Sequence, residues 1–124
     1  MPTSEEDVFT TWTSQIDNDS VSVICLCGEL DASTVPTLLA DVKSVISQRK
    51  DVIMDVHLLS YVDSTGVAAL LSTRSALIGG GNKMCLVGCH GLLTKVIQLI
   101  RVENELRCFE DVDTAVAQFR AGVW

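Results

Sequence analysis

The residues best suited to chemistry lie in one short segment in the middle of the chain, Asp63-Ser64-Thr65-Gly66. It places a carboxylate, two hydroxyl groups and a glycine directly before apolar residues at helical spacing. The first turn of a helix has backbone N–H groups without intrahelical partners and a partial positive charge. Asp63 can cap such a helix, and Ser64 would then occupy an exposed position that tolerates an anion. By itself the segment favours a plain helix cap, because Asp and Ser are among the commonest capping residues.

The sequence fits a serine hydrolase or a response-regulator receiver poorly. A hydrolase with Ser64 as nucleophile would need a Gly-x-Ser-x-Gly motif and a partner histidine, and neither His57 nor His90 fits such a pattern. Both histidines are expected in loops. Asp55, at the end of a predicted strand, could be the phosphoacceptor of a response-regulator receiver. Receivers need a lysine after the last strand, and residues 106–109 contain none.

The cysteines do not indicate a disulfide framework or a metal site. An odd number of them lies mostly within apolar runs, where free cysteine behaves as a small hydrophobic residue, so reduced and buried thiols are expected. Cys85, Cys89 and His90 are close in sequence, but no Cys-x-x-Cys pair accompanies them. No metal and no cofactor are expected. The five cysteines are Cys25, Cys27, Cys85, Cys89 and Cys108.

The elements that must position Ser64 follow from the apolar spacing. Alternating or continuous apolar runs predict strands, and apolar residues three and four apart predict helices. The order is β-β-α-β-α-β-α-β-α, which indicates an α/β fold: a small mixed, mostly parallel sheet of 4–5 strands with an N-terminal hairpin and about four helices. The predicted strands are 9–16, 21–27, 51–56, 84–88 and 106–109, and the predicted helices start near 33, 63, 92 and 111.

Functional sites in such sheets gather where strands end and helices begin. Two predicted loops meet that description. One is Gly28-Glu29-Leu30-Asp31, and the other runs from His57 to Gly66.

Composition limits the partners that such a site could bind. The chain has 124 residues, 48% of them hydrophobic, and a formal net charge of −7. We expect one cytoplasmic domain over residues 1–124, with residues 1–7 disordered, because no signal peptide and no apolar run of about 18 residues is present. The acidic surface disfavours nucleic acid and anionic membrane as partners.

Two motifs together carry a family resemblance. Residues 28–31, Gly-Glu-Leu-Asp, and residues 61–67, Tyr-Val-Asp-Ser-Thr-Gly-Val, resemble the STAS domain, in particular bacterial anti-sigma factor antagonists of the sporulation and stress-response type. The resemblance extends over roughly Val8–Phe119 and includes the glycines at 79–81 before a strand. Either motif alone is weak, but both in order and in the right elements are specific.

The resemblance implies a regulator of transcription that is not an enzyme. Ser64 matches the serine that a partner anti-sigma factor, itself an ATP-dependent serine kinase, phosphorylates in that family. The unmodified form binds that partner and frees the sigma factor, and a PP2C-type phosphatase restores the serine. Thr65 stands where some members have a second serine, so it is a possible second acceptor. The implied partner-binding residues are Gly28, Glu29, Leu30, Asp31, Asp63, Ser64, Thr65 and Gly66.

The resemblance further implies that Asp63 orients the Ser64 hydroxyl or caps the helix next to it. It also implies that Gly66 lets a partner approach the backbone. The alternative is a STAS module without a phospho-switch: a scaffold, a ligand sensor or a transport-associated subunit.

Overall fold

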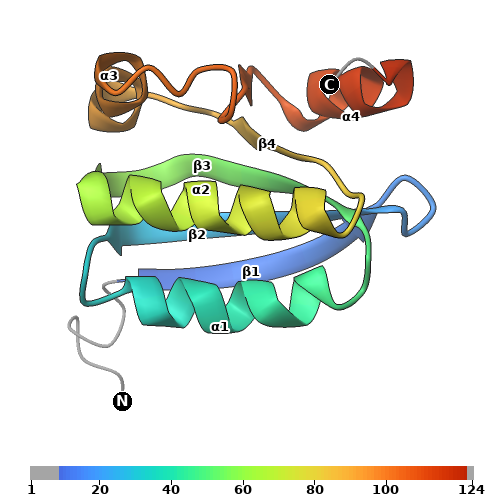
Figure 1. Ribbon diagram of the computed structural model, residues 1–124, viewed down its shortest axis with the longest axis horizontal. Coiled ribbons are helices and arrows are strands. Elements are labelled where there is room, and N and C mark those ends of the chain that lie inside the picture. Colours follow the sequence, from blue (N-terminus) through green and yellow to red (C-terminus); the bar gives the residue numbers. More distant parts are fainter. Residues whose placement is uncertain (1–8, 123–124) are drawn as a thin grey trace.

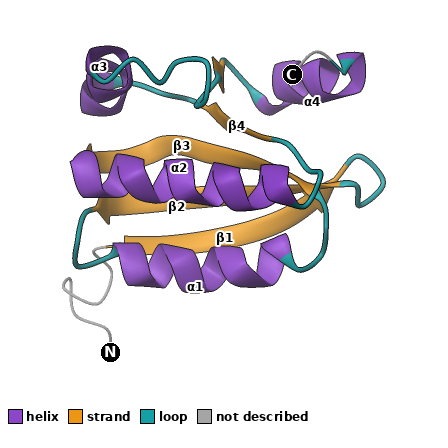
Figure 2. Ribbon diagram, in the orientation of Figure 1, coloured by secondary structure: helices purple, strands orange, loops and turns teal. Residues whose placement is uncertain are grey.

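The computed structural model describes residues 9–122, which form five strands and four helices in the predicted order (Figures 1 and 2). The expectation that residues 1–7 are disordered lies outside the described residues. The strands are β1 (Phe9–Ile16), β2 (Val21–Leu30), β3 (Asp51–Val62), β4 (Met84–Val87) and β5 (Cys108–Phe109). The helices are α1 (Val35–Ile46), α2 (Ser64–Gly79), α3 (Gly91–Leu99) and α4 (Val112–Ala121).

The strands form one sheet in the order β1-β2-β3-β4-β5. β1 and β2 pair antiparallel, from Phe9 opposite Gly28 to Ile16 opposite Val21, and the three remaining pairs are parallel. Each parallel pair is joined by a helical crossover, as parallel strands require. The predicted fold, a mixed and mostly parallel sheet with an N-terminal hairpin, is therefore confirmed.

The two faces of the sheet carry separate hydrophobic clusters. Leu38 of α1, Leu70 of α2 and Leu93 of α3 all belong to the larger cluster, so these three helices cover one face. Figure 1 shows α1 and α2 lying side by side in front of the strands. Phe119 of α4 and Ile53 of β3 belong to the smaller cluster on the opposite face. Side chains alternate between faces along a strand, so β2, β3 and β4 each contribute to both clusters.

The turn between β1 and β2 uses three consecutive residues with left-handed backbone. Asp17, Asn18 and Asp19 have φ values of 54°, 57° and 64°. Aspartate and asparagine tolerate this region better than other non-glycine residues. The Asp17 carboxylate also accepts a hydrogen bond from Arg120 of α4, which ties the turn to the C-terminal helix.

Both predicted loops are wrong in part. Gly28 to Leu30 form the end of β2, so only Asp31 of that segment lies outside a strand. Residues His57 to Val62 are not loop but the second half of β3, which stays paired with β2 as far as Val62 opposite Leu30. The register shifts between Cys25 and Cys27, and an extra β3 residue is accommodated there. Such a bulge changes which side chains face the core, and this removed the regular alternation that marks a strand. The expectation that His57 is a loop residue is wrong for the same reason, whereas His90 directly precedes α3.

The four helices begin within two residues of their predicted starts. The Asp111 carboxylate caps α4 by accepting from the backbone N–H of Thr114 at 2.8 Å. α2 ends at Gly79, as the run of glycines predicted. Within residues 9–122 no helix combines the length and the apolar character that crossing a membrane requires.

Candidate functional site

The two segments selected from the sequence meet at the carboxyl ends of β2 and β3. These strands lie next to each other and run parallel, so their ends share one edge of the sheet. The backbone N–H of Asp63 donates to the carbonyl oxygen of Leu30 at 3.3 Å and joins the two segments directly. The structure thus brings together residues that are about thirty positions apart in sequence.

Ser64 is the first residue of α2 and is exposed. Asp63 precedes it in an extended conformation, and its carboxylate accepts a hydrogen bond from the backbone N–H of Gly66 at 3.0 Å. Asp63, rather than Ser64, therefore caps the helix. Thr65 is the second helical residue and is also exposed. The Ser64 hydroxyl thus stands at the positive end of a sixteen-residue helix.

Two residues expected on a partner surface are buried instead. Leu30 is 0% exposed, and Gly66 is buried beneath the first turn of α2. A Cβ on Gly66 would lie 2.7 Å from the carbonyl oxygen of Leu30 and 2.8 Å from the Cγ2 of Val62. The expectation that Gly66 opens its backbone to a partner is therefore wrong. Its missing side chain lets α2 pack against the end of β2, and Leu30 forms the other half of that contact.

Asp31 organises the loop that follows β2. Its Oδ1 accepts hydrogen bonds from the backbone N–H of Ser33 at 2.9 Å, the Ser33 hydroxyl at 2.7 Å and the backbone N–H of Thr34 at 3.2 Å. The Ser33 hydroxyl, followed by the other hydrogen bonds, holds the pKa of Asp31 below its ordinary value. The Thr34 hydroxyl donates to the carbonyl of Glu29 at 2.7 Å, so Thr34 braces the loop and makes no side-chain cap on α1. Asp31 is therefore held as a carboxylate.

The remaining expected residues form the open part of the site. Glu29 is exposed, and Gly28 is half-buried with a φ of 110° that favours glycine. The Ser60 hydroxyl donates to the Gly28 carbonyl at 3.2 Å and links β3 to this position. Together with Asp31 and Asp63, Glu29 makes the surroundings of Ser64 acidic.

The histidines are engaged away from Ser64. The Nδ1 of His57 lies 2.5 Å from Oδ1 of Asp55, and the Nε2 of His90 donates to the backbone carbonyl of His57 at 2.9 Å. Within residues 9–122, neither histidine is hydrogen-bonded to the Ser64 hydroxyl. Asp55 is hydrogen-bonded to His57, which lies on the same strand.

The expectation that all cysteines are reduced and buried is wrong. Cys89 and Cys108 form a disulfide with a Cα–Cα distance of 6.3 Å, and Cys108 is exposed. Only Cys25, Cys27 and Cys85 are free. The disulfide joins the start of α3 to β5, because Cys89 lies two residues before the helix. Burial raises the pKa of the Cys85 thiol to about 12, so that thiol is inert as sequence reasoning expected.

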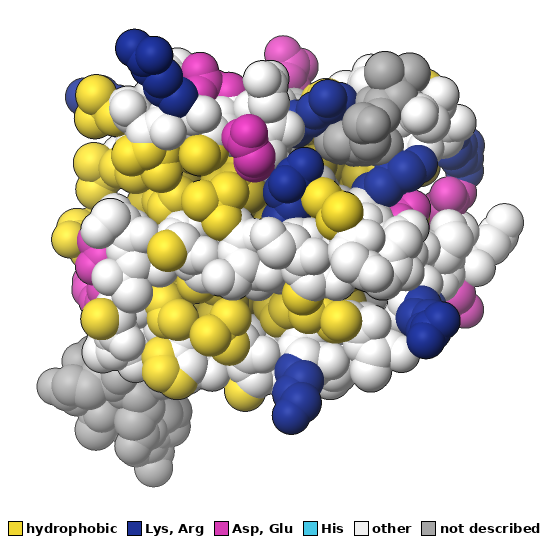
Figure 3. Space-filling view, viewed as in Figure 1, with side chains coloured by type: hydrophobic (Ala, Val, Ile, Leu, Met, Phe, Trp, Pro, Cys, Tyr) yellow, Lys and Arg dark blue, Asp and Glu magenta, His cyan; other side chains and the backbone are white. Residues whose placement is uncertain are grey.

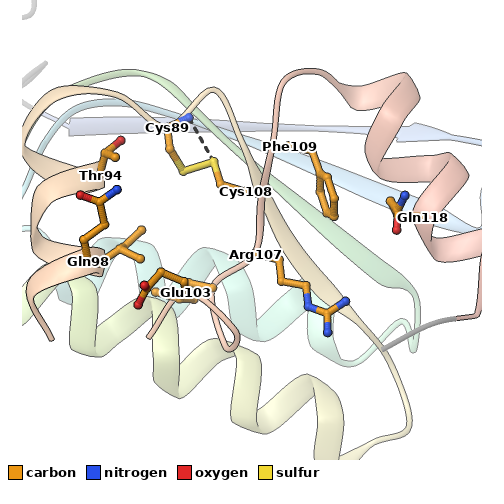
Figure 4. A pocket seen from close by; sticks show the side chains of 10 residues that line it. Cys89, Thr94, Gln98, Glu103, Arg107, Cys108, Phe109 and Gln118 are labelled. Atoms are coloured by element: carbon orange, nitrogen blue, oxygen red, sulfur yellow. Dashed lines mark hydrogen bonds between the residues drawn. A yellow bond between two sulfur atoms is a disulfide. The ribbon is translucent and has the colours of Figure 1, made fainter. Parts of the chain in front are cut away.

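The disulfide borders a cavity of about 390 Å³ between α3, β5 and α4 (Figure 4). Figure 4 shows Thr94 and Gln98 on one side of it, Phe109 and Gln118 on the other, and the disulfide between them. None of the residues that the sequence selected for the site lines this cavity. Nothing in the cysteine spacing indicated it, since Cys89 and Cys108 are nineteen residues apart.

Comparison with known families decides the relationship. The STAS domain model matches residues 15–115, which is most of the chain. The chain belongs to the STAS domain family. The matched region contains the joined ends of β2 and β3 and the whole of α2. No curated protein matches the sequence significantly.

Several solved structures share this fold at low sequence identity. An anti-sigma factor antagonist from Mycobacterium paratuberculosis has 24% identity and a TM-score of 0.81, with 92% of this chain and 96% of that chain covered. The Bacillus cell fate determinant SpoIIAA in its phosphorylated form has 22% identity and a TM-score of 0.68, covering 89% and 99%. A murine solute carrier 26 family anion transporter has 19% identity and a TM-score of 0.69, covering 91% of this chain but 22% of the transporter.

Proposed function

We propose that this STAS domain is an anti-sigma factor antagonist whose partner binding is switched by phosphorylation of Ser64. The unmodified form binds an anti-sigma factor that is also a serine kinase, in the cytoplasm, and so releases the sigma factor. Phosphorylation ends that complex, and a PP2C-type phosphatase restores it. The chain acts as substrate and binding partner, not as enzyme. The observation that carries the proposal is the exposed Ser64 hydroxyl at the start of a helix that Asp63 already caps.

The charge around Ser64 explains how a phosphate would act as a switch. Phosphorylation adds about −1.5 to −2 charges at pH 7. At the free surface, water and salt screen the repulsion from Asp63, and the helix N-terminus favours the new anion. Within a complex the partner excludes water, and like charges brought together there cost several kcal/mol. A partner that meets the acidic edge of Asp31 and Asp63 would therefore bind the unmodified form only.

Exposed hydrophobic side chains on the same side as α1, α2 and α3 support a protein partner. Figure 3 shows hydrophobic side chains gathered in the bands between α1 and α2 and between α2 and α3. Several large apolar side chains that remain exposed belong to these helices or directly follow them. They are Leu39, Ile78, Leu92, Leu99 and Ile100.

The test compares charge at position 64 with the same charge elsewhere on α2. Ser64→Ala and Ser64→Asp are used as baits in the native host, with Ser72→Asp as the matched control because Ser72 is exposed farther along the helix. A protein with a serine-kinase domain should be captured by the wild type, Ser64→Ala and Ser72→Asp, and lost with Ser64→Asp. Equal capture by Ser64→Ala and Ser64→Asp contradicts the switch.

Phosphorylation itself is tested on the purified chain. Incubation with the captured kinase and ATP should modify Ser64 in preference to Thr65, as peptide mapping reports. The thermal stability of the phosphorylated domain should stay within about 1 kcal/mol of the unmodified one, because the helix dipole and the nearby carboxylates oppose each other. Modification mainly at Thr65, or a large loss of stability, contradicts this account.

The second candidate is a STAS module without a phospho-switch. The similarity to one segment of an anion transporter favours it, because the matched segment is only 22% of that larger protein. Under this alternative a transporter or scaffold component would be captured, and its capture would not depend on position 64.

A further inference from the structure

A sulfur, an oxygen and a nitrogen ligand converge on the face of the sheet opposite α1, α2 and α3. Cys25, Asp55 and His57 each offer one ligand atom, and the three atoms lie within 4.8 Å of one another. Among residues 9–122 they are the one group of three such side chains at this spacing. Neither Ser64 nor the two loops around it takes part. We propose that Cys25, Asp55 and His57 bind a zinc-type divalent cation.

The ligand set selects the class of metal. Zinc binds cysteine sulfur at about 2.3 Å, histidine nitrogen at about 2.0–2.1 Å and carboxylate oxygen at about 2.0–2.2 Å. Magnesium and calcium prefer oxygen ligands alone, so a thiolate and an imidazole disfavour them. Three protein ligands leave the fourth tetrahedral position to water, which can enter because the His57 side chain is 55% exposed.

The observed distances need only small adjustments. In a tetrahedral site neighbouring ligand atoms lie about 3.3–3.7 Å apart, given those bond lengths. The Nδ1 of His57 and Oδ1 of Asp55 are 2.5 Å apart around a shared hydrogen, and no separation within the group exceeds 4.8 Å. Side-chain rotations that move these atoms by about 1 Å produce the required geometry. The distance between Nδ1 of His57 and Oδ1 of Asp55 increases, and the largest separation within the group decreases.

The backbone beneath the site is held firmly. Cys25 and Asp55 are register partners on the paired strands β2 and β3, and the backbone N–H of His57 donates to Asp55 at 3.1 Å. His90 donates to the His57 carbonyl at 2.9 Å. A Cβ on Gly88 would lie 2.7 Å from the Cβ of His57, so the glycine allows the two strands to approach there. Ligands on a sheet keep their spacing without an ordering cost.

The charges balance when a metal binds. Cys25 is a buried free thiol, and it must lose its proton to bind a cation. On binding, the metal forms bonds to Sγ of Cys25, to the Asp55 carboxylate and to a ring nitrogen of His57. The Cys25 thiol proton is released to solvent, and the hydrogen between Asp55 and His57 is then carried by the ring nitrogen of His57 that does not bind the metal, which leaves the other ring nitrogen and the carboxylate free to bind. One thiolate and one carboxylate then neutralise the two positive charges.

The experiment titrates the full chain with Co²⁺ and with Zn²⁺. Co²⁺ bound to a thiolate gives a sulfur-to-metal charge-transfer band, and Zn²⁺ should abolish that band by displacement at one equivalent. Cys25→Ser should remove the band, and Asp55→Asn and His57→Gln should each weaken binding by more than about tenfold. Cys27→Ser is the matched control, because Cys27 is a free, half-buried thiol two residues along the same strand.

Each outcome decides the proposal. Circular dichroism shows whether Cys25→Ser still folds, and if it does not, His57→Gln decides because its side chain is mostly exposed. Absence of the band in the wild-type chain with excess cobalt overturns the site. So does a band that survives Cys25→Ser in a folded protein, a band lost in Cys27→Ser, or unchanged affinity in His57→Gln.

Discussion

The first turn of α2 rests so closely on the end of β2 that a Cβ at Gly66 would reach within 2.7 Å of the carbonyl oxygen of Leu30. A main-chain hydrogen bond from Asp63 to the same oxygen fixes this arrangement. Neither contact involves the exposed Ser64 hydroxyl. The position of the candidate site therefore depends on a backbone contact between two strand ends, and this contact can be tested directly.

Gly66→Ala should destabilise the protein by about 1–3 kcal/mol, because the new methyl group is forced against backbone that cannot move aside easily. Gly79→Ala is the matched control in the same helix, since a Cβ there meets no atom within 4 Å. That variant should keep or slightly raise stability, because alanine favours helix. Urea unfolding of both variants measures the difference. Equal midpoints would contradict the close approach.

Asp63→Ala should lower the unfolding free energy by about 0.5–2 kcal/mol, because the N-terminus of α2 loses its cap. Asp111→Ala removes the same kind of cap from α4 and should also lower stability. Only the first change should reduce capture of the partner of Ser64. Chemical denaturation and the pull-down described above, carried out on both variants, give the comparison. A similar loss of capture in both would mean that stability alone controls binding.

Loss of the Cys89–Cys108 disulfide should cost about 2–3 kcal/mol, because it closes a loop with a sequence separation of 19 residues. Adding a thiol reductant and replacing both cysteines with serine should lower the urea midpoint equally. The double variant should no longer respond to reductant. Cys27→Ser, which changes a free thiol, should keep the response of the wild type. A wild-type midpoint that ignores reductant would contradict the prediction.

Stability should fall in acid below about pH 4. Hydrogen bonds from Arg120, Ser33 and Thr114 lower the pKa values of Asp17, Asp31 and Asp111 respectively. A carboxyl group whose pKa is lower in the folded state stabilises that state above its unfolded pKa of about 3.9, and the contribution disappears as pH falls through the folded pKa. These groups therefore add no slope between about pH 5 and 7.

The variant Asp111→Asn isolates one of these groups. Asparagine still caps a helix but does not titrate, so the acid-dependent loss of stability should become smaller while stability at pH 7 changes little. Urea midpoints measured from pH 3 to pH 7 report both. An unchanged acid dependence would show that Asp111 does not contribute.

Much of the fold could be predicted because local patterns agreed with it. The strand at Phe9–Ile16 and the helix that starts near residue 111 are confirmed at their predicted positions. The second half of β3 could not be predicted, because the register shift near Cys25 breaks the alternation that identifies a strand. Only pairing with β2 shows that this segment is extended.

The sequence indicated where the candidate residues lie in the fold, but not which of them are buried. Asp63, Ser64 and Asp31 lie at the joined ends of β2 and β3, as the sequence indicated. The burial of Leu30 and Gly66 results from a contact between segments far apart in sequence, which no local pattern reports. The disulfide and the cluster around Cys25 were missed for the same reason.

The capping of α2 by Asp63 leaves the identity of residue 64 largely free of structural constraint. An alanine, threonine or acidic residue there would keep the helix start, the sheet and the neighbouring loop, while it would change whether the protein can be modified. Under the proposed switch, a single substitution at residue 64 would therefore create or remove regulation without a loss of stability that other substitutions must offset. Related domains with a fixed acidic residue or alanine at this position would keep the fold, but their partner binding would no longer be reversible by phosphorylation.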